Sequence, residues 1–306
     1  MEKLALLFAG QGAQFPGMGK NLYEENQRAR EIFNQVEEIR PGTIKQICDE
    51  TFDDLNSTKN TQICVFIMDY ICGQLLLESG LEPEALAGFS LGELAALTVA
   101  ESMSLDEAIK LVIARGAYMQ ECSDKYPGKM AAVIRPDEGA LKELCEKTGV
   151  YMANISSAGQ ISVSGQADKM DFFMKEADEL GMRYVQVPVS GAFHTPLMEE
   201  ASEKLRLELE KIDFKEPKYK VFSNMYARPY PTDSVSIRDM LARQITSSVL
   251  FRDSLNNMSD IGVDTFVECG PGKTLAGFVK KTLKGSCIYN VCDNESYDMC
   301  VRELNS

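Results

Sequence analysis

The sequence predicts an α/β protein in which helices cover a mostly parallel β-sheet. Short apolar segments alternate with helical segments along most of the 306 residues, and this alternation is typical of a parallel sheet covered on both faces. A Gly-x-Ser-x-Gly sequence at 88–92 joins one apolar segment to a helix. Between residues 125 and 192 the order changes to β-α-β-β-α-β, which indicates a small inserted subdomain.

The N-terminal region begins with an apolar run at 4–9 that predicts a buried parallel strand. A glycine-rich turn at 10–14 lacks the third glycine of a dinucleotide fingerprint and the lysine of a P-loop, so we expect it to offer a backbone N–H to the functional site. Residues 20–60 favour helices and loops. The most apolar stretch lies in a helix expected over 61–78, and its polar interruptions favour a buried helix over a membrane span.

Residues 86–92 read Leu-Ala-Gly-Phe-Ser-Leu-Gly, which is the sequence of a nucleophile elbow. Gly88 and Gly92 would let two backbones pass close together, so that Ser90 is held in a strained conformation before a helix over 93–100. The N-terminus of that helix directs N–H groups toward an oxyanion formed at Ser90. We therefore expect the larger domain to be hydrolase-like.

The next helix is expected over 104–121. Ser104 and Glu107 have the spacing of a capping box. Arg115 lies beside the apolar face of this helix. An arginine in such a place needs a carboxylate partner, either in the protein or in a ligand.

Tyr126-Pro127-Gly128 breaks the chain before the inserted subdomain. The expected strands lie at 129–134, 149–154, 160–164 and 183–187, with helices over 136–147 and 167–180. This order is that of a ferredoxin-like unit. We expect the ferredoxin-like subdomain to span 125–192 and to close over the larger domain.

The large α/β domain then comprises residues 1–124 and 193–306. Its second part is expected to contain helices over 197–212, 236–246 and 273–284 and strands at 219–223, 264–268 and 287–291. The last dozen residues are polar, and we expect them to be frayed. His194, the single histidine of the chain, lies where the chain returns to the large domain.

Composition excludes several classes of function. The net charge of −14 argues against a nucleic-acid partner. The nine cysteines are scattered without a C-x-x-C pair, so we expect no metal site and a reducing cytosol. The N-terminus lacks the features of a signal peptide. We expect a cytoplasmic monomer with no membrane partner.

Ser90 and His194 suggest a nucleophile and its base, because a serine hydroxyl is a poor nucleophile until an imidazole takes its proton. The alternative is a helix-capping serine and an unrelated buried histidine. Ordinary α/β-hydrolases place their histidine late in the chain, after an acidic partner. His194 lies in mid-chain with no obvious acid, so that fold is a poor fit.

Five ordered motifs resemble those of malonyl-CoA:acyl carrier protein transacylases, and the resemblance covers about residues 4–285. The motifs are Gly10-Gln11-Gly12-Ala13-Gln14, Gly88-Phe89-Ser90-Leu91-Gly92-Glu93, Arg115-Gly116-Ala117-Tyr118-Met119, Gly191-Ala192-Phe193-His194-Thr195 and Glu268-Cys269-Gly270-Pro271-Gly272-Lys273.

The resemblance implies a malonyl group carried on Ser90, with His194 as general base and then general acid. A backbone carbonyl near Gln244 would orient the histidine in place of an aspartate. The backbone N–H groups of Gln11 and Leu91 would form the oxyanion hole. The reaction it implies moves malonyl from malonyl-CoA to the phosphopantetheine thiol of acyl carrier protein in fatty-acid synthesis, with no bound cofactor.

The resemblance also implies the residues that bind the substrate. Arg115 would hold the free carboxylate of malonate as a bidentate pair, while an internal salt bridge to a glutamate is the alternative. Phe193 has the bulk that discourages a methyl branch. Met119 would line the same pocket, and Asn154 matches a family position near the site.

One residue departs from the family pattern, because Phe89 replaces the histidine that usually precedes the nucleophile. The pair of Ser90 and His194 survives this change, so we expect an active enzyme. Three alternatives remain open: a polyketide-pathway acyltransferase, an acyl-thioester hydrolase, and an inactive homologue that binds carrier protein.

Overall fold

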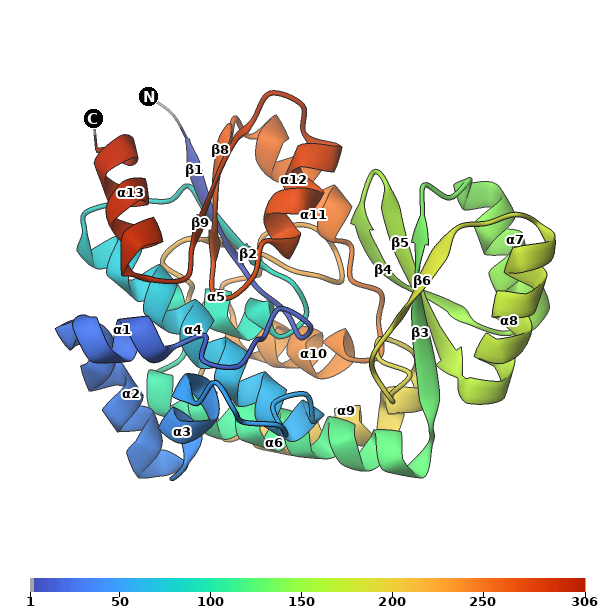
Figure 1. Ribbon diagram of the computed structural model, residues 1–306, viewed down its shortest axis with the longest axis horizontal. Coiled ribbons are helices and arrows are strands. Elements are labelled where there is room, and N and C mark those ends of the chain that lie inside the picture. Colours follow the sequence, from blue (N-terminus) through green and yellow to red (C-terminus); the bar gives the residue numbers. More distant parts are fainter. Residues whose placement is uncertain (1–2, 306) are drawn as a thin grey trace.

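A computed structural model describes residues 3–305 and has two units that lie side by side (Figure 1). The larger unit contains a five-stranded parallel sheet, and the smaller unit contains a four-stranded antiparallel sheet. The arrangement confirms the predicted α/β class.

The parallel sheet has the strand order β7-β2-β1-β8-β9. Its strands are β1 (Leu4–Phe8), β2 (Ala85–Gly88), β7 (Lys220–Phe222), β8 (Thr265–Cys269) and β9 (Cys287–Val291). In register, Leu6 of β1 lies between Leu86 of β2 and Val267 of β8. Because the strands are parallel, the turns that follow β1, β2 and β8 meet at one edge of the sheet.

Helices cover both faces of this sheet. Those before the small unit are α1 (Lys20–Glu25), α2 (Gln27–Ile39), α3 (Thr43–Cys48), α4 (Thr58–Glu78), α5 (Gly92–Val99) and α6 (Leu105–Lys125). Those after it are the 3₁₀ turn η1 (Pro196–Met198), α9 (Glu199–Leu209), α10 (Ser234–Gln244), α11 (Phe251–Asp260), α12 (Thr274–Thr282) and α13 (Asn294–Leu304).

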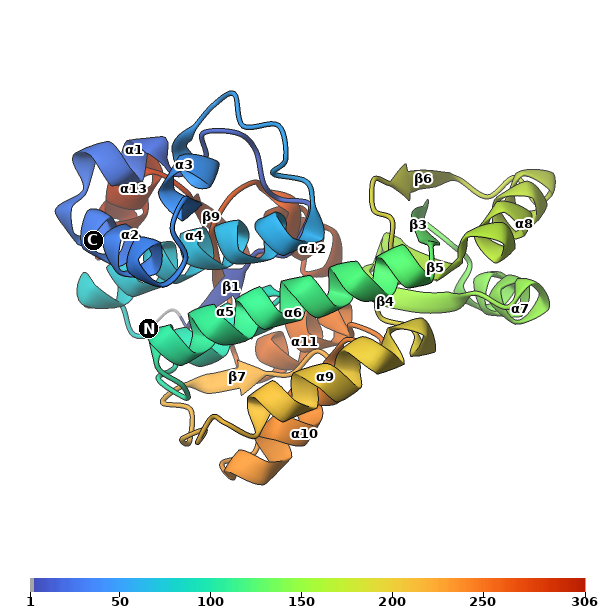
Figure 2. The same ribbon diagram turned by 90° about the horizontal axis from the view of Figure 1, so that it is seen from below.

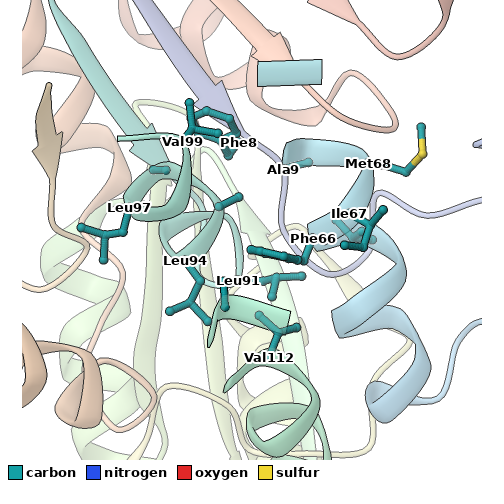
Figure 3. Close-up of a cluster of buried hydrophobic side chains, with 14 of the residues drawn as sticks. Phe8, Ala9, Phe66, Ile67, Met68, Leu91, Leu94, Leu97, Val99 and Val112 are labelled. Atoms are coloured by element: carbon teal, nitrogen blue, oxygen red, sulfur yellow. The ribbon is translucent and has the colours of Figure 1, made fainter. Parts of the chain in front are cut away.

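Alternate residues of β1 enter two different hydrophobic cores, as the period of a strand requires. Leu6 and Phe8 join a core with side chains of α4, α5 and α6. Leu7 joins a second core with side chains of α11 and α12. Figure 3 shows part of the first core, where Phe8, Phe66, Leu94 and Val112 come from four different elements. Burial on both faces explains why β1 is apolar at every position.

Helix α4 is the one helix of the described chain that is long and apolar enough to cross a membrane. Within the protein, 83% of its most apolar stretch is buried. Its residues pack against the sheet, α2, α5 and α6, so the structure accounts for its apolar sequence by internal packing, as predicted.

The small unit comprises β3 (Gly128–Ile134), α7 (Glu138–Thr148), β4 (Tyr151–Ser157), β5 (Gln160–Gln166), α8 (Ala167–Glu179) and β6 (Tyr184–Val187). The strand order is β4-β5-β3-β6, and each neighbouring pair is antiparallel. This is the ferredoxin-like arrangement that the element order predicts. Its helices α7 and α8 lie on the side away from the large unit (Figure 1).

Two connections join the small unit to the large one. The chain enters and leaves at neighbouring points, where the N–H of Gly128 donates to the carbonyl of Ser190 at 2.9 Å. On the other side, β4 pairs with the segment before α11, because Val249 exchanges hydrogen bonds with Ala153 and Ile155. The long helix α6 runs from the large unit to the start of β3 (Figure 2).

The prediction of a frayed C-terminus was wrong, because α13 occupies 294–304. The Asp293 side chain accepts a hydrogen bond from the N–H of Ser296, and the two residues form a capping box. Cys300 is buried, and residues 297, 301 and 304 pack against the large core. These positions have the i, i+3, i+4, i+7 spacing of an amphipathic helix, so polar composition alone was misleading here.

Candidate active site

The turn between β2 and α5 is a strained elbow that requires both of its glycines. Ser90 has a positive φ of 54°, which a side chain rarely adopts. A Cβ on Gly88 would lie 1.8 Å from the carbonyl carbon of Gly92, and a Cβ on Gly92 would lie 2.2 Å from the carbonyl oxygen of Phe8. The backbones therefore pass as closely as the sequence predicts, and Ser90 stands at the carboxyl edge of the sheet.

His194 lies opposite Ser90, although the two residues are 104 positions apart in the sequence. Its Nε2 lies 2.8 Å from Ser90 Oγ, and its Nδ1 lies 3.1 Å from the carbonyl oxygens of Gln244 and Ser247. Because carbonyl oxygens only accept, Nδ1 must carry the imidazole proton. Nε2 is then free to accept the proton of the Ser90 hydroxyl.

The environment keeps this imidazole neutral. Burial, and then the charge of Arg115, lower the pKa of His194 to about 4. The two carbonyl contacts oppose this shift but do not reverse it. A neutral imidazole at pH 7 is the state in which His194 can act as a base.

Arg115 lies on α6 with only 1% of its surface exposed. It donates from Nη2 to Ser90 Oγ at 3.1 Å and to Gln244 Oε1 at 3.0 Å, and from Nη1 to Gln62 Oε1. Within the described chain no carboxylate oxygen forms a salt bridge with it. Burial lowers the pKa of Arg115 to about 10, so the guanidinium stays charged at neutral pH and its direct partners are neutral.

Gln11 follows β1 and Leu91 follows Ser90, so the edge of the sheet brings both close to the serine. Neither backbone N–H donates a hydrogen bond to another of the residues described. Gln62 donates from Nε2 to the Gln11 side chain at 3.0 Å while it accepts from Arg115. One residue of α4 thus links the turn after β1 to the buried arginine.

A cavity of about 190 Å³ opens onto Ser90 and His194. Gln11, Met119, Phe193 and Asn154 all line it, as the resemblance predicts; Leu91, Arg115 and Gln244 lie behind its wall. Both units supply the remaining wall, and the small unit contributes Ser156, Gln160, Ser162 and Val187 among others. Substrate would therefore lie between the two units.

Phe89 turns away from the catalytic pair into an aromatic cluster. Its ring centroid lies 5.4 Å from that of Phe251 and 5.7 Å from that of Phe278. Phe89 and Phe278 also line the cavity. An apolar wall therefore stands where the family pattern has a second imidazole, and the contact between Ser90 and His194 does not depend on it.

Sequence reasoning missed four polar residues that support the site. Gln62, Asn224 and Tyr230 were not singled out, and Glu93 was named only as part of a motif, with no role of its own. Asn224 holds the backbone of the elbow, since its Oδ1 accepts from the Ser90 N–H at 2.8 Å and its Nδ2 donates to the Gly88 carbonyl at 2.7 Å. A signal existed in two cases. Gln62 is a polar residue in the most apolar helix, and Asn224 follows a strand at the carboxyl edge of the sheet.

A metal centre has no support in the described residues, where no group of three or more His, Cys, Asp or Glu side chains is placed to hold an ion.

A strained serine whose hydroxyl faces a neutral imidazole is an arrangement suited to acyl transfer. Comparison with known proteins also finds acyltransferases. The family model described as "Acyl transferase domain" matches residues 5–299. The chain belongs to this acyltransferase family.

Individual relatives are similar over nearly the whole chain. The "Malonyl CoA-acyl carrier protein transacylase" of Bacillus subtilis (strain 168) is 36% identical over 311 residues, covering 99% of this chain and 98% of the relative. The crystal structure of malonyl CoA-acyl carrier protein transacylase from Clostridium perfringens has a TM-score of 0.93 at 34% identity, covering 99% and 97% of the two chains. These similarities confirm the resemblance seen in the sequence.

A third relative was solved with a partner. A malonyl-transacylase in complex with its type II PKS acyl-carrier protein has a TM-score of 0.94 at 26% identity, covering 99% of this chain and 100% of the other.

Proposed function

We propose that this acyltransferase moves a malonyl group from malonyl-CoA to the phosphopantetheine thiol of an acyl carrier protein, through a malonyl ester on Ser90. The observation that carries the proposal is the convergence on Ser90 Oγ of a neutral imidazole and a buried guanidinium, which has no carboxylate partner among residues 3–305. The names of the relatives support the donor and the carrier.

In the first half-reaction, Ser90 Oγ attacks the thioester carbonyl while His194 Nε2 takes the hydroxyl proton. The oxygen of the tetrahedral intermediate becomes an anion, which the N–H groups of Gln11 and Leu91 would stabilise. Each such donor contributes on the order of 10²–10³ in rate. Collapse of the intermediate breaks the C–S bond, and the imidazolium returns its proton to the CoA sulfur.

The substrate carboxylate would bind beside Arg115. A charge-assisted contact contributes ~1.5–3 kcal/mol, which corresponds to a preference of roughly 10- to 150-fold for malonyl over acetyl. The bound carboxylate would also offset the positive charge that lowers the pKa of His194. Malonyl binding would therefore make the imidazole a stronger base, while an acetyl group would not.

In the second half-reaction, the carrier thiol gives its proton to His194 and attacks the malonyl ester, which restores the Ser90 hydroxyl. The thiol arrives on a pantetheine arm that contains two amides. On the cavity wall, Asn154 Oδ1 and Ser156 Oγ are buried without hydrogen-bond partners. Such groups favour a ligand with amide N–H and C=O groups, so we assign them to this arm. These steps need no bound cofactor, since proton transfer and acyl exchange complete them.

The test is the intact mass of the protein after brief mixing with malonyl-CoA, acetyl-CoA or methylmalonyl-CoA. We expect a malonyl adduct that is absent in Ser90→Ala and that disappears when carrier protein is added, with malonyl-carrier formed in equal amount. Equal labelling by acetyl-CoA would remove the role given to Arg115. Release of free malonate as fast as CoA, without carrier, would make the protein a hydrolase, and no adduct at all would make it a carrier-binding homologue.

A further inference from the structure

Glu93, the first residue after the second elbow glycine, is buried at the centre of a hydrogen-bond network behind Ser90. Its Oε1 accepts from the backbone N–H of Asn224 at 2.9 Å and from Tyr230 Oη at 2.6 Å. Its Oε2 accepts from Gln244 Nε2. Glu93 has no surface exposed, and protein groups occupy both of its carboxylate oxygens, so we assign it no contact with substrate.

Two of these partners hold the backbone of the nucleophile. Gln244 Nε2 also donates to the Ser90 carbonyl at 2.7 Å, and Asn224 Oδ1 accepts from the Ser90 N–H at 2.8 Å. Both backbone polar groups of Ser90 are therefore bonded to residues that contact Glu93. The positive φ of Ser90 is maintained by these two side chains.

Glu93 and Arg115, at the two ends of the network, determine the direction of each hydrogen bond between them. An ionised carboxylate can only accept and a guanidinium can only donate. The Gln244 amide lies between them, with its NH₂ group on Glu93 and its oxygen on Arg115 Nη2 at 3.0 Å. Glu93 therefore selects the orientation of the amide that accepts from Arg115.

We propose that Glu93 is a positioning residue for acyl transfer: its carboxylate fixes the Gln244 amide, and through Gln244 and Asn224 it holds Arg115 and Ser90 in the reactive arrangement. The proposal rests on the proposed function, because the step it controls is the acylation of Ser90.

Neutral replacement of the carboxylate cannot preserve this network. In Glu93→Gln, an NH₂ group in place of Oε1 would face the N–H of Asn224. The same group in place of Oε2 would face the NH₂ of Gln244, and if Gln244 turned over, its NH₂ would face Arg115. Every arrangement leaves two donors in contact, and a buried unsatisfied donor costs about 1–3 kcal/mol, which corresponds to roughly 5- to 150-fold in rate.

Protonation of Glu93 would have a similar effect, since it places a hydrogen on one of the two accepting oxygens. Burial raises the pKa of Glu93 to about 6, against the hydrogen bonds from Tyr230, Asn224 and Gln244 and the charge of Arg115. Arg115 on α6 and Tyr230 after β7 are the ionisable groups that face it. Tyr230 is neutral, because its pKa is raised well above its usual value by burial.

The experiment measures single-turnover acylation of Ser90 by a subsaturating concentration of the malonyl thioester of N-acetylcysteamine between pH 4.5 and 8, so that the rate reports the ionisations of the protein without bound substrate. This thioester carries no phosphate, so no ionisation of the substrate near pH 6 obscures the result. In the unaltered protein we expect the rate to fall as the pH drops through about 6, above the range in which His194 with a pKa of about 4 takes up a proton.

The two variants should change this fall in different ways. Glu93→Gln should lower the rate at pH 7.5 roughly 5- to 150-fold and remove the fall near pH 6. Tyr230→Phe removes a donor that stabilises the carboxylate, so the fall should move to higher pH. If Glu93→Gln does not fold, as judged by circular dichroism, the direction seen for Tyr230→Phe decides.

The matched control is Glu37→Gln, because Glu37 likewise accepts a hydrogen bond on each carboxylate oxygen, from the backbone N–H groups of Gly42 and Ile44, but lies on α2 outside the site. It should keep the unaltered pH profile. A shift in Glu37→Gln, or an unshifted profile in Tyr230→Phe, would overturn the proposal. If the unaltered protein is not acylated at any pH, the proposed function fails instead.

Discussion

Arg115 is a buried cation whose direct hydrogen-bond partners are two glutamine amides and a serine hydroxyl. A charge removed from water normally lies against an opposite charge, and the internal salt bridge left open by the sequence does not form among the residues described. The guanidinium is instead held in place by neutral groups. Its charge thus remains available for a carboxylate that arrives with the substrate.

Replacement of Arg115 by alanine should therefore change substrate preference more than general reactivity. We expect the ratio of malonyl to acetyl acylation rates to fall roughly 10- to 150-fold, mostly through the malonyl rate. Competition between the two CoA thioesters, followed by intact mass, measures the ratio directly. An equal loss for both substrates would indicate that the residue only maintains the site.

At the scale of residues, the sequence predicted the reacting groups but not their supports. Ser90 was identified by the glycines of its elbow, and His194 by being the single histidine within a recognisable motif. Glu93, Asn224 and Tyr230 could not be paired in this way, because Asn224 and Tyr230 lie 131 and 137 residues after Glu93 and meet it only in the folded chain. The role of Gln244 followed from resemblance alone.

Among the elements, α6 supports the site most directly, since it carries Arg115 and Met119 and spans both units. Its N-terminus has the capping box that the sequence predicts, with Ser104 accepting from the N–H of Glu107 and Glu107 accepting from Ser104. Other predicted elements needed only small changes of boundary. The helices α1–α3 were not separated beforehand, although α2 carries a clear signal, since its buried residues Ala29, Ile32, Phe33 and Val36 have the i, i+3, i+4, i+7 spacing of an amphipathic helix.

Removal of the cap on α6 should affect stability and not catalysis. Ser104→Ala should lower the free energy of unfolding by about 1 kcal/mol, as measured by urea denaturation. Acylation of Ser90 should be unchanged, since Arg115 lies about 16 Å along the helix from the cap. Ser104→Asp retains a capping oxygen and serves as the control; equal destabilisation of both variants would contradict a capping role.

At the scale of the whole molecule, the parallel sheet was predicted but its strand order was not. Sequence periodicity indicates that a strand is buried on both faces, yet it carries no information on which strand lies beside it. The order β7-β2-β1-β8-β9 places the strand at 220–222 next to the elbow strand, and this neighbour is what brings Asn224 to Ser90. The contact of Asn224 with Ser90 could therefore not be predicted from the sequence, because the strand order was unknown.

The distribution of thiols gives a prediction for the intact fold. Of the nine cysteines, Cys287 is exposed, Cys48 and Cys292 are partly buried, and six are buried. Burial raises the pKa of Cys48 to about 11 and also raises that of Cys292, so these thiols react slowly. An alkylating reagent should label one site rapidly in the native protein and nine in denaturant, as counted by mass. Fewer than nine in denaturant would reveal a disulfide.

The neighbouring entry and exit of the small unit have a consequence for how this enzyme can change. The chain crosses twice at one place, beside Gly128 and Ser190, and between those crossings it supplies much of the wall that faces the acyl group and its carrier arm. Ser90, His194 and Arg115 all lie outside the crossings. The wall is therefore a cassette: the residues between the crossings that are assigned to the carrier arm, Asn154 and Ser156, can evolve or be engineered separately from Ser90 and His194. The residues assigned to acyl preference, Arg115 and Phe193, lie outside the cassette and stay with the large unit.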